Sequence, residues 1–113
     1  MPPPPVYECQ LHHAPDRLYC RIRGELGLDG ISDLLATVMG WLMGHTGVVQ
    51  IDLRETDYLD ADAIQGLYRT HIRANSRGSR LILVTRSFHD RLLHFVGLDS
   101  VFNTAGTISD PKE

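Results

Sequence analysis

The sequence has few cysteines, no long apolar run and no dense run of basic residues, and each of these absences excludes a class of protein. Two cysteines, Cys9 and Cys20, are too few for a disulfide framework, and we expect both to be small apolar strand residues with reduced thiols. No apolar run approaches the roughly 20 residues of a membrane-spanning helix. A formal net charge of −3 without a Lys/Arg cluster argues against nucleic acid as the main partner.

The N-terminus does not have the pattern of a signal peptide, because MPPPPVYE has neither a basic start nor an apolar stretch. A cytoplasmic location is therefore expected. The length of 113 residues, of which 42% are hydrophobic, suits one domain with a single core. We expect a proline-rich tail over residues 1–5, one domain over residues 6–104 and a polar tail over residues 105–113.

The start of the domain alternates apolar and polar residues, which predicts an opening β-hairpin. The alternation covers residues 6–11 and 18–23, and residues 13–16 between them are typical of a turn. Two later apolar runs, VVQIDL and LILV, are typical of buried strands. A last short strand is expected over residues 101–103.

Three segments between and after these strands have apolar residues at helical spacing. The first helix is expected from Ile31, capped by Asp29 or Gly30, and the second from about Asp60. The third, in SFHDRLLHFVGL, has a capping-box start, an apolar face and a glycine stop of the Schellman type. The order ββαβαβαβ predicts an α/β fold with a mixed, largely parallel sheet against which the helices pack.

Several side chains on or beside these apolar stripes are expected to contribute to packing. Met39, Trp41 and Met43 flank the stripe of the first helix, and packing is favoured there over a partner surface. His71 lies on the stripe of the second helix and is expected to be hydrogen-bonded and partly buried.

Three stretches, taken in order, resemble a known family. They are RIRGELG, then VVQIDLRETDYLDADAIQGLYRTH, then RLILVTRSFHDRLLHFVGLDSVF. Their order and spacing resemble the STAS domain, the fold of bacterial anti-sigma factor antagonists, over about residues 6–104. The resemblance implies a STAS-like fold and a role in protein–protein interaction.

The sequence departs from this family at the phosphorylation site. Antagonists typically have Asp-Ser-Ser-Gly or Asp-Ser-Thr-Gly there, and the second hydroxyl is phosphorylated by an anti-sigma factor that is also a serine kinase. The matching residues are Asp60, Ala61, Asp62 and Ala63, so Asp62 occupies the phosphoacceptor position. Phosphorylation at the usual position is therefore excluded. The frequent Gly-Glu-Leu-Asp motif also departs, because Gly27 replaces its acid.

A fixed acid at Asp62 has two interpretations. It places a negative charge where a phosphoserine would lie, although a phosphoserine carries about −1.5 to −2 charges and three acceptor oxygens. An acid in the first turn of a helix is also favoured by the helix dipole, by about 0.3–1 kcal/mol. The sequence supports both interpretations equally.

The resemblance also implies a partner and a surface for it. The partner would be an anti-sigma factor or another ATP-binding serine kinase. The surface would consist of Leu26, Gly27, Asp29, Asp57, Tyr58, Asp60, Ala61, Asp62, Ala63 and Gln65. The alternative is a constitutive regulatory or scaffold subunit of a stress-sensing assembly or of a lipid-transport ATPase, and a homodimer is also open.

Enzymatic and metal-binding interpretations have weaker support. Asp52 lies near the end of a predicted central strand, as in response-regulator receivers, but the other acids and the lysine of a receiver site are not seen. Asp57, Asp60 and Asp62 lack the calcium-loop pattern, and the cysteines and histidines of the hairpin fit no usual zinc spacing. Because no nucleophile lies beside a base either, we expect no enzyme, no metal and no cofactor.

Overall fold

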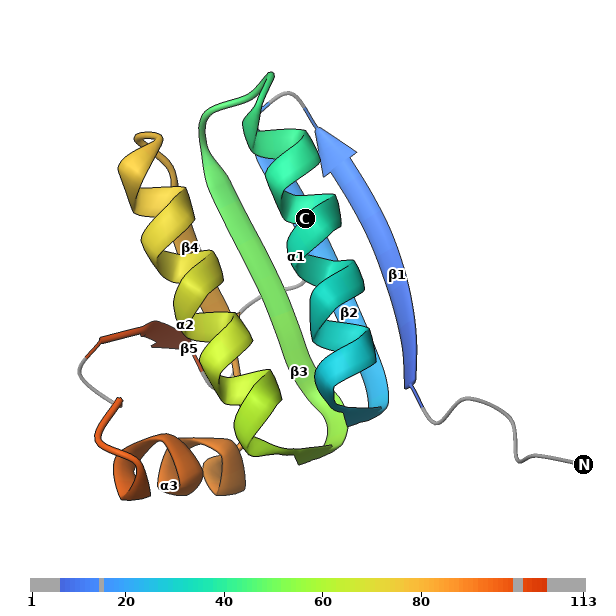
Figure 1. Cartoon of the computed structure of the whole chain (residues 1–113), viewed down its shortest axis with the longest axis vertical. Coiled ribbons are helices and arrows are strands. Elements are labelled where there is room, and N and C mark those ends of the chain that lie inside the picture. Colours follow the sequence, from blue (N-terminus) through green and yellow to red (C-terminus); the bar gives the residue numbers. More distant parts are fainter. Residues whose placement is uncertain (1–6, 15, 99–100, 106–113) are drawn as a thin grey trace, which may run out of the picture.

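The computed structural model describes residues 7–14, 16–98 and 101–105, and side chains over 16–98, 101 and 102. Within these residues the chain forms strands and helices in the order predicted (Figure 1). They are β1 (Tyr7–Ala14), β2 (Arg17–Leu26), α1 (Leu28–Leu42), β3 (Val48–Leu59), α2 (Ala61–Ser76), β4 (Arg80–Val84), α3 (Ser87–Phe95) and β5 (Asn103–Ala105). The two expected tails fall almost wholly outside the described residues.

The strands form one sheet in the order β1-β2-β3-β4-β5. The pair β1–β2 is antiparallel, whereas β2–β3, β3–β4 and β4–β5 are parallel, so the predicted mixed, largely parallel sheet is confirmed. Right-handed crossovers that step in one direction across a sheet place their helices on the same face. Accordingly, α1 and α2 lie side by side across one face, and α3 lies at the end of the sheet near the start of α2 (Figure 1).

Several element boundaries differ from the prediction. α1 begins at Leu28 with Gly27 as its N-cap, so the expected caps at Asp29 or Gly30 are wrong. Its first turn closes through the backbone, since the Ile31 amide donates to the Gly27 carbonyl at 2.9 Å. Leu28 is 58% exposed and lies off the apolar stripe, which is why the periodicity did not reveal this turn.

The strands β2 and β3 are longer than their apolar runs, because they pair with each other as far as Leu26 and Leu59 across two register shifts. β5 begins at Asn103, two residues later than expected. The predicted Schellman stop of α3 is confirmed: Gly97 has a positive φ of 80°, and the Leu98 amide donates to the Leu93 carbonyl at 2.8 Å.

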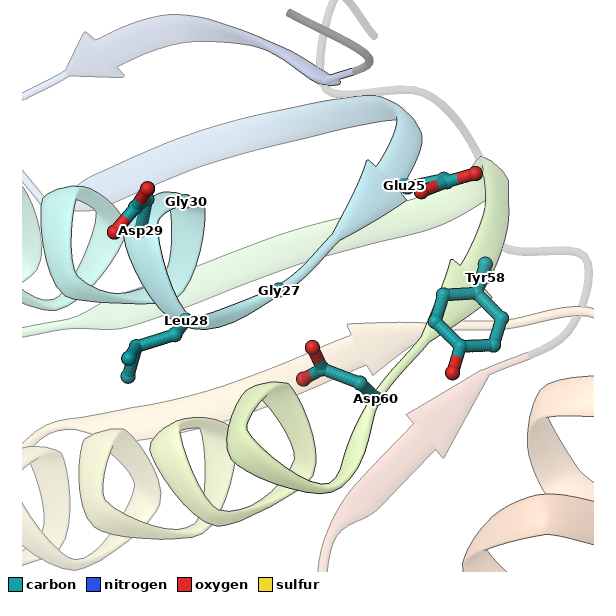
Figure 2. Close-up of a pocket in the computed structure, with 7 residues that line it drawn as sticks. All are labelled: Glu25, Gly27, Leu28, Asp29, Gly30, Tyr58 and Asp60. Atoms are coloured by element: carbon teal, nitrogen blue, oxygen red, sulfur yellow. The ribbon is translucent and has the colours of Figure 1, made fainter.

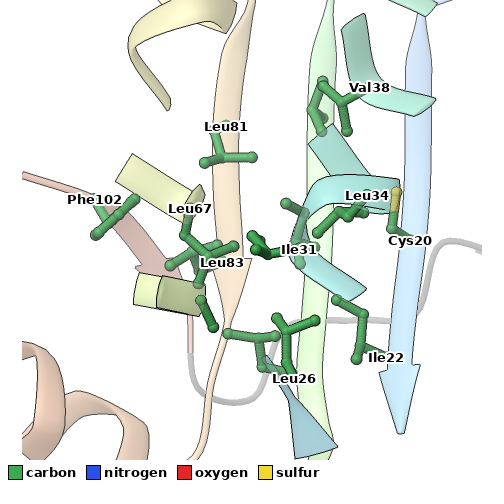
Figure 3. Close-up of a cluster of buried hydrophobic side chains, with 14 of the residues drawn as sticks. Cys20, Ile22, Leu26, Ile31, Leu34, Val38, Leu67, Leu81, Leu83 and Phe102 are labelled. Atoms are coloured by element: carbon green, nitrogen blue, oxygen red, sulfur yellow. The ribbon is translucent and has the colours of Figure 1, made fainter. Parts of the chain in front are cut away.

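The core lies between the sheet and the two long helices (Figure 3). Cys20 is fully buried in it, as expected, while the side chain of Cys9 lies outside the described residues. α1 and α2 approach closely at Gly66, where an added Cβ would lie 2.1 Å from the Ile31 Cγ1 atom. Only a residue without a side chain fits this contact.

The flanking side chains pack largely as expected. Trp41 is buried and Met39 packs against the core, but Met43 is 76% exposed, so the packing expectation is wrong there. His71 is buried and its Nε2 atom lies 3.2 Å from the Asn75 side-chain amide, which confirms the expected hydrogen bond. Among the described residues, none of the helices is both long and apolar enough to span a membrane.

Candidate functional site

The first turn of α2 is fixed by Asp60, which follows the last residue of β3. One Asp60 carboxylate oxygen accepts a hydrogen bond from the Ala63 amide at 2.8 Å, and this is the N-cap of the helix. The Asp60 amide donates to the Leu26 carbonyl at 3.3 Å. A Cβ at Gly27 would lie 2.9 Å from the other carboxylate oxygen, so the loop after β2 lies directly against Asp60 (Figure 2).

Asp62 is in the same turn but is held differently. Its side chain is exposed, and within the described part of the chain it makes no hydrogen bond or ion pair. Because the amides at the start of a helix carry partial positive charge, an acid is favoured there without any direct contact. Asp62 therefore presents a negative charge to the solvent in the first turn of α2.

An open hollow of about 370 Å³ lies beside this turn (Figure 2). We call it the α2-turn hollow; it is lined by Glu25, Gly27, Leu28, Asp29, Gly30, Tyr58 and Asp60. Two of its side chains are apolar and largely exposed, Leu28 at 58% and Tyr58 at 55%. The hollow therefore combines exposed apolar surface with several carboxylates.

The fold brings the sequence-predicted surface residues together, with two exceptions. Tyr58, Asp60 and Asp29 line the α2-turn hollow, and Ala61 and Gln65 are exposed on the adjoining helix. Leu26 and Ala63, by contrast, are fully buried in the core, so their side chains cannot contact a partner.

A second open hollow, of about 490 Å³, lies between the end of β3 and α3. We call it the α3 groove; it is lined by Asp57, Tyr58, Leu59, Phe88, Arg91, Leu92 and Phe95. Phe95 is 86% exposed, so the apolar face of this helix is only partly covered. The helix ends at Phe95, whereas Leu93 of the same helix is buried in the core.

His89 joins α3 to β3, and no pattern in the sequence assigned it a role. The imidazole is fully buried. Its Nδ1 atom accepts a hydrogen bond from the Arg86 amide at 2.9 Å, and Nε2 lies 2.9 Å from the Thr56 carbonyl. Because a carbonyl only accepts, Nε2 carries the proton and donates. Burial lowers the pKa of His89 below its ordinary value, and the nearby Arg86 guanidinium lowers it further.

The start of α3 differs from the predicted capping box for the same reason. The N-cap is Arg86 rather than Ser87, and the His89 ring occupies the place of the expected acid. Asp90 instead accepts a hydrogen bond from the Thr85 hydroxyl at 2.7 Å. A histidine three residues after a strand-to-helix junction is the sequence signal that could have indicated this contact.

Asp52 is a buried structural acid. It accepts hydrogen bonds from the Tyr19 hydroxyl and from the Arg54 amide and guanidinium, the shortest of the Arg54 contacts being 2.7 Å. Burial by itself would raise the pKa of Asp52, but these hydrogen bonds hold it below its ordinary value. Since β3 continues to Leu59, Asp52 does not lie at a strand end as a receiver aspartate does. Its oxygens are occupied by the protein itself.

In the described part of the chain, no three His, Cys, Asp or Glu side chains are grouped so that they could hold a metal ion. Asp57, Asp60 and Asp62 in particular form no such group. The side chains of His12 and His13 lie outside the described residues.

A family model described as "Mlab, STAS domain" matches residues 9–103. The chain belongs to this family of STAS domains. Its fold is that of solved anti-sigma factor antagonists. The antagonist from Mycobacterium paratuberculosis has a TM-score of 0.75 at 16% identity, covering 96% of this chain and 92% of that one. The Bacillus cell fate determinant SpoIIAA, in its phosphorylated form, has a TM-score of 0.70 at 16% identity, covering 87% and 91%. No curated protein matches the chain.

Proposed function

We propose that this STAS domain is a cytoplasmic protein-interaction domain, not an enzyme, that docks on an anti-sigma factor with serine-kinase activity. The docking surface consists of the first turn of α2, the α2-turn hollow and Asp57. The single observation that carries the proposal is the exposed carboxylate of Asp62 at the phosphoacceptor position. The likeness to antagonists supports the partner class, and SpoIIAA is a relative of this fold known in a phosphorylated form.

The charge at Asp62 is permanent, so a kinase cannot switch it on or off. Asp60 already caps the helix, so Asp62 is not needed for a capping hydrogen bond. Ala61, Asp62 and Ala63 offer a kinase no hydroxyl group. We propose that the domain resembles a permanently phosphorylated antagonist, which binds its kinase weakly because the carboxylate enters the interface without a partner.

The binding experiment compares wild type, Asp62→Ser and Asp62→Ala with each serine-kinase anti-sigma factor encoded in the same genome. Calorimetry with ATP present gives the affinities, and mass spectrometry detects transferred phosphate. We expect Asp62→Ser to bind tightly and to become phosphorylated, while the wild type binds weakly and stays unmodified. Equal affinities for all three proteins would remove the phosphate-mimic role and leave an antagonist that its kinase cannot switch off.

A second candidate function follows from the missing hydroxyl groups. A domain that cannot be switched by phosphorylation in the first turn of α2 suits a constitutive subunit, either of a stress-sensing assembly or of a lipid-transport ATPase. The family description names Mlab and a STAS domain without naming an antagonist, so it is compatible with this alternative. Stable co-purification with an ATPase or with a particle of megadalton size, and no binding to any serine kinase, would support it over the first proposal.

A further inference from the structure

The two hollows of the site share one side chain. Tyr58 is 55% exposed and lines both the α2-turn hollow and the α3 groove. Asp57, which precedes it, lies on the groove side. A protein that covers the first turn of α2 and contacts Tyr58 therefore also reaches the entrance of the groove.

Most of the side chains that line the α3 groove are apolar or aromatic. Leu59 is buried, Leu92 is partly buried and Phe95 is 86% exposed. Single exposed apolar side chains are common and need no explanation. Here, however, Tyr58 and Phe95 border the same groove, and an exposed apolar cluster with a polar rim is typical of an interaction site.

The charges around the two hollows differ in sign. Glu25, Asp29 and Asp60 line the α2-turn hollow. On the groove side Asp57 is already paired, since its carboxylate lies 3.6 Å from the Arg86 guanidinium. Arg91 is exposed, and among the described residues no carboxylate pairs with it. The groove therefore leaves a positive charge beside apolar surface, whereas the α2-turn hollow leaves negative charges.

We propose that the α3 groove is the second half of the docking surface, and that it takes an apolar segment of the same partner with an acidic side chain facing Arg91. This inference rests on the proposed function and extends it to a surface that the family motif does not include. An amphipathic helix laid in a hydrophobic groove is one recurring form of such an occupant. Charge complementarity fixes its direction, with basic residues over the α2-turn hollow and the acidic residue over α3.

The test measures binding of the full chain to the serine-kinase anti-sigma factor with ADP present, both in the wild type and with Asp62→Asn, which removes the repelling charge. Phe95→Ser and Arg91→Glu are the test variants. Met43→Ser and Arg80→Glu are matched controls, because Met43 is 76% exposed and Arg80 is exposed at the other end of the molecule. We expect each test variant to weaken binding about tenfold, as loss of an anchor contact does, and each control to change it less than twofold.

If Phe95→Ser and Arg91→Glu bind the kinase as tightly as the control variants do, the groove proposal is overturned. The proposed function then still stands if Asp62→Ser alters affinity. If the wild type and Asp62→Asn bind no kinase, both proposals fail together. Sedimentation velocity of the chain alone tests whether a second copy of this chain occupies the groove instead. If the wild type is a dimer, Phe95→Ser is a monomer and kinase affinity is unchanged, the groove belongs to a second copy and the proposal is overturned.

Discussion

Asp60 and Asp62, two residues apart in the first turn of α2, have different roles. The Asp60 carboxylate accepts a hydrogen bond from the Ala63 amide and lies against the loop at Gly27, so it is part of the helix start. Asp62 makes no such contact and adds only its charge to the turn. Asp60 is thus explained by local structure, whereas the Asp62 side chain is not needed for the cap.

This difference predicts unequal effects on stability. Asp60→Ala should lower the free energy of unfolding by about 0.5–2 kcal/mol, because the Ala63 amide loses its cap. Asp62→Ala should lower it by only about 0.3–1 kcal/mol, since only the dipole interaction is lost. Urea unfolding of both variants at neutral pH measures the two values. A larger loss for Asp62→Ala would contradict the assignment of the cap.

At the scale of elements, α1 and α2 are in contact through Gly66, and α3 is attached to β3 through His89. Both attachments depend on residues that meet only in the folded chain. The helix periodicity predicted each element, but it could not indicate that one glycine must remain a glycine. It also could not show that a histidine replaces the acid of a capping box.

The helix contact predicts opposite results for two glycines. Alanine normally stabilises a helix relative to glycine by up to about 1 kcal/mol. Gly66→Ala should nevertheless destabilise the protein by about 1–3 kcal/mol, because the new methyl group overlaps the Ile31 side chain. Gly40→Ala, where an added Cβ meets nothing within 4 Å, should be neutral or stabilising. The melting temperatures of the two variants test this prediction, and stabilisation by Gly66→Ala would exclude the close contact with Ile31.

The His89 attachment predicts a pH-dependent stability. The folded state holds the pKa of His89 below its ordinary value of 6.5, so between these two values the unfolded chain binds more protons. The contribution of the His89 contact to stability should therefore be fully present above about pH 6.5, and it should be lost as the pH drops through the pKa of His89 in the folded state. Protonation places an N–H group on Nδ1 against the Arg86 amide, which breaks the start of α3.

The control for this effect is His89→Gln. Its side-chain oxygen can still accept a hydrogen bond from the Arg86 amide, but glutamine does not titrate. Urea unfolding at pH 7 and at pH 5.5 compares the two proteins. We expect a smaller loss of stability on acidification in His89→Gln than in the wild type. The same loss in both would assign the pH dependence to other groups.

For the whole molecule, the order of elements and the mixed sheet could be predicted because each element has its own apolar period. The family could be predicted as well, from the order of three stretches. The α2-turn hollow was predicted only in part, since Leu28 lies off the stripe and Leu26 proved to be core. The α3 groove was missed, because it depends on where β3 ends relative to α3 and on which side of α3 stays exposed.

The central claim is that the charge of Asp62, rather than its shape, sets the affinity of the docking surface. The most direct measurement is calorimetric binding of wild type and Asp62→Asn to the same serine-kinase anti-sigma factor with ADP present. Asparagine keeps the shape and removes the charge, so we expect binding at least about tenfold tighter, or 1.4 kcal/mol. Equal affinities, with both proteins folded by thermal unfolding, would contradict the account and leave Asp62 as a residue of the helix start.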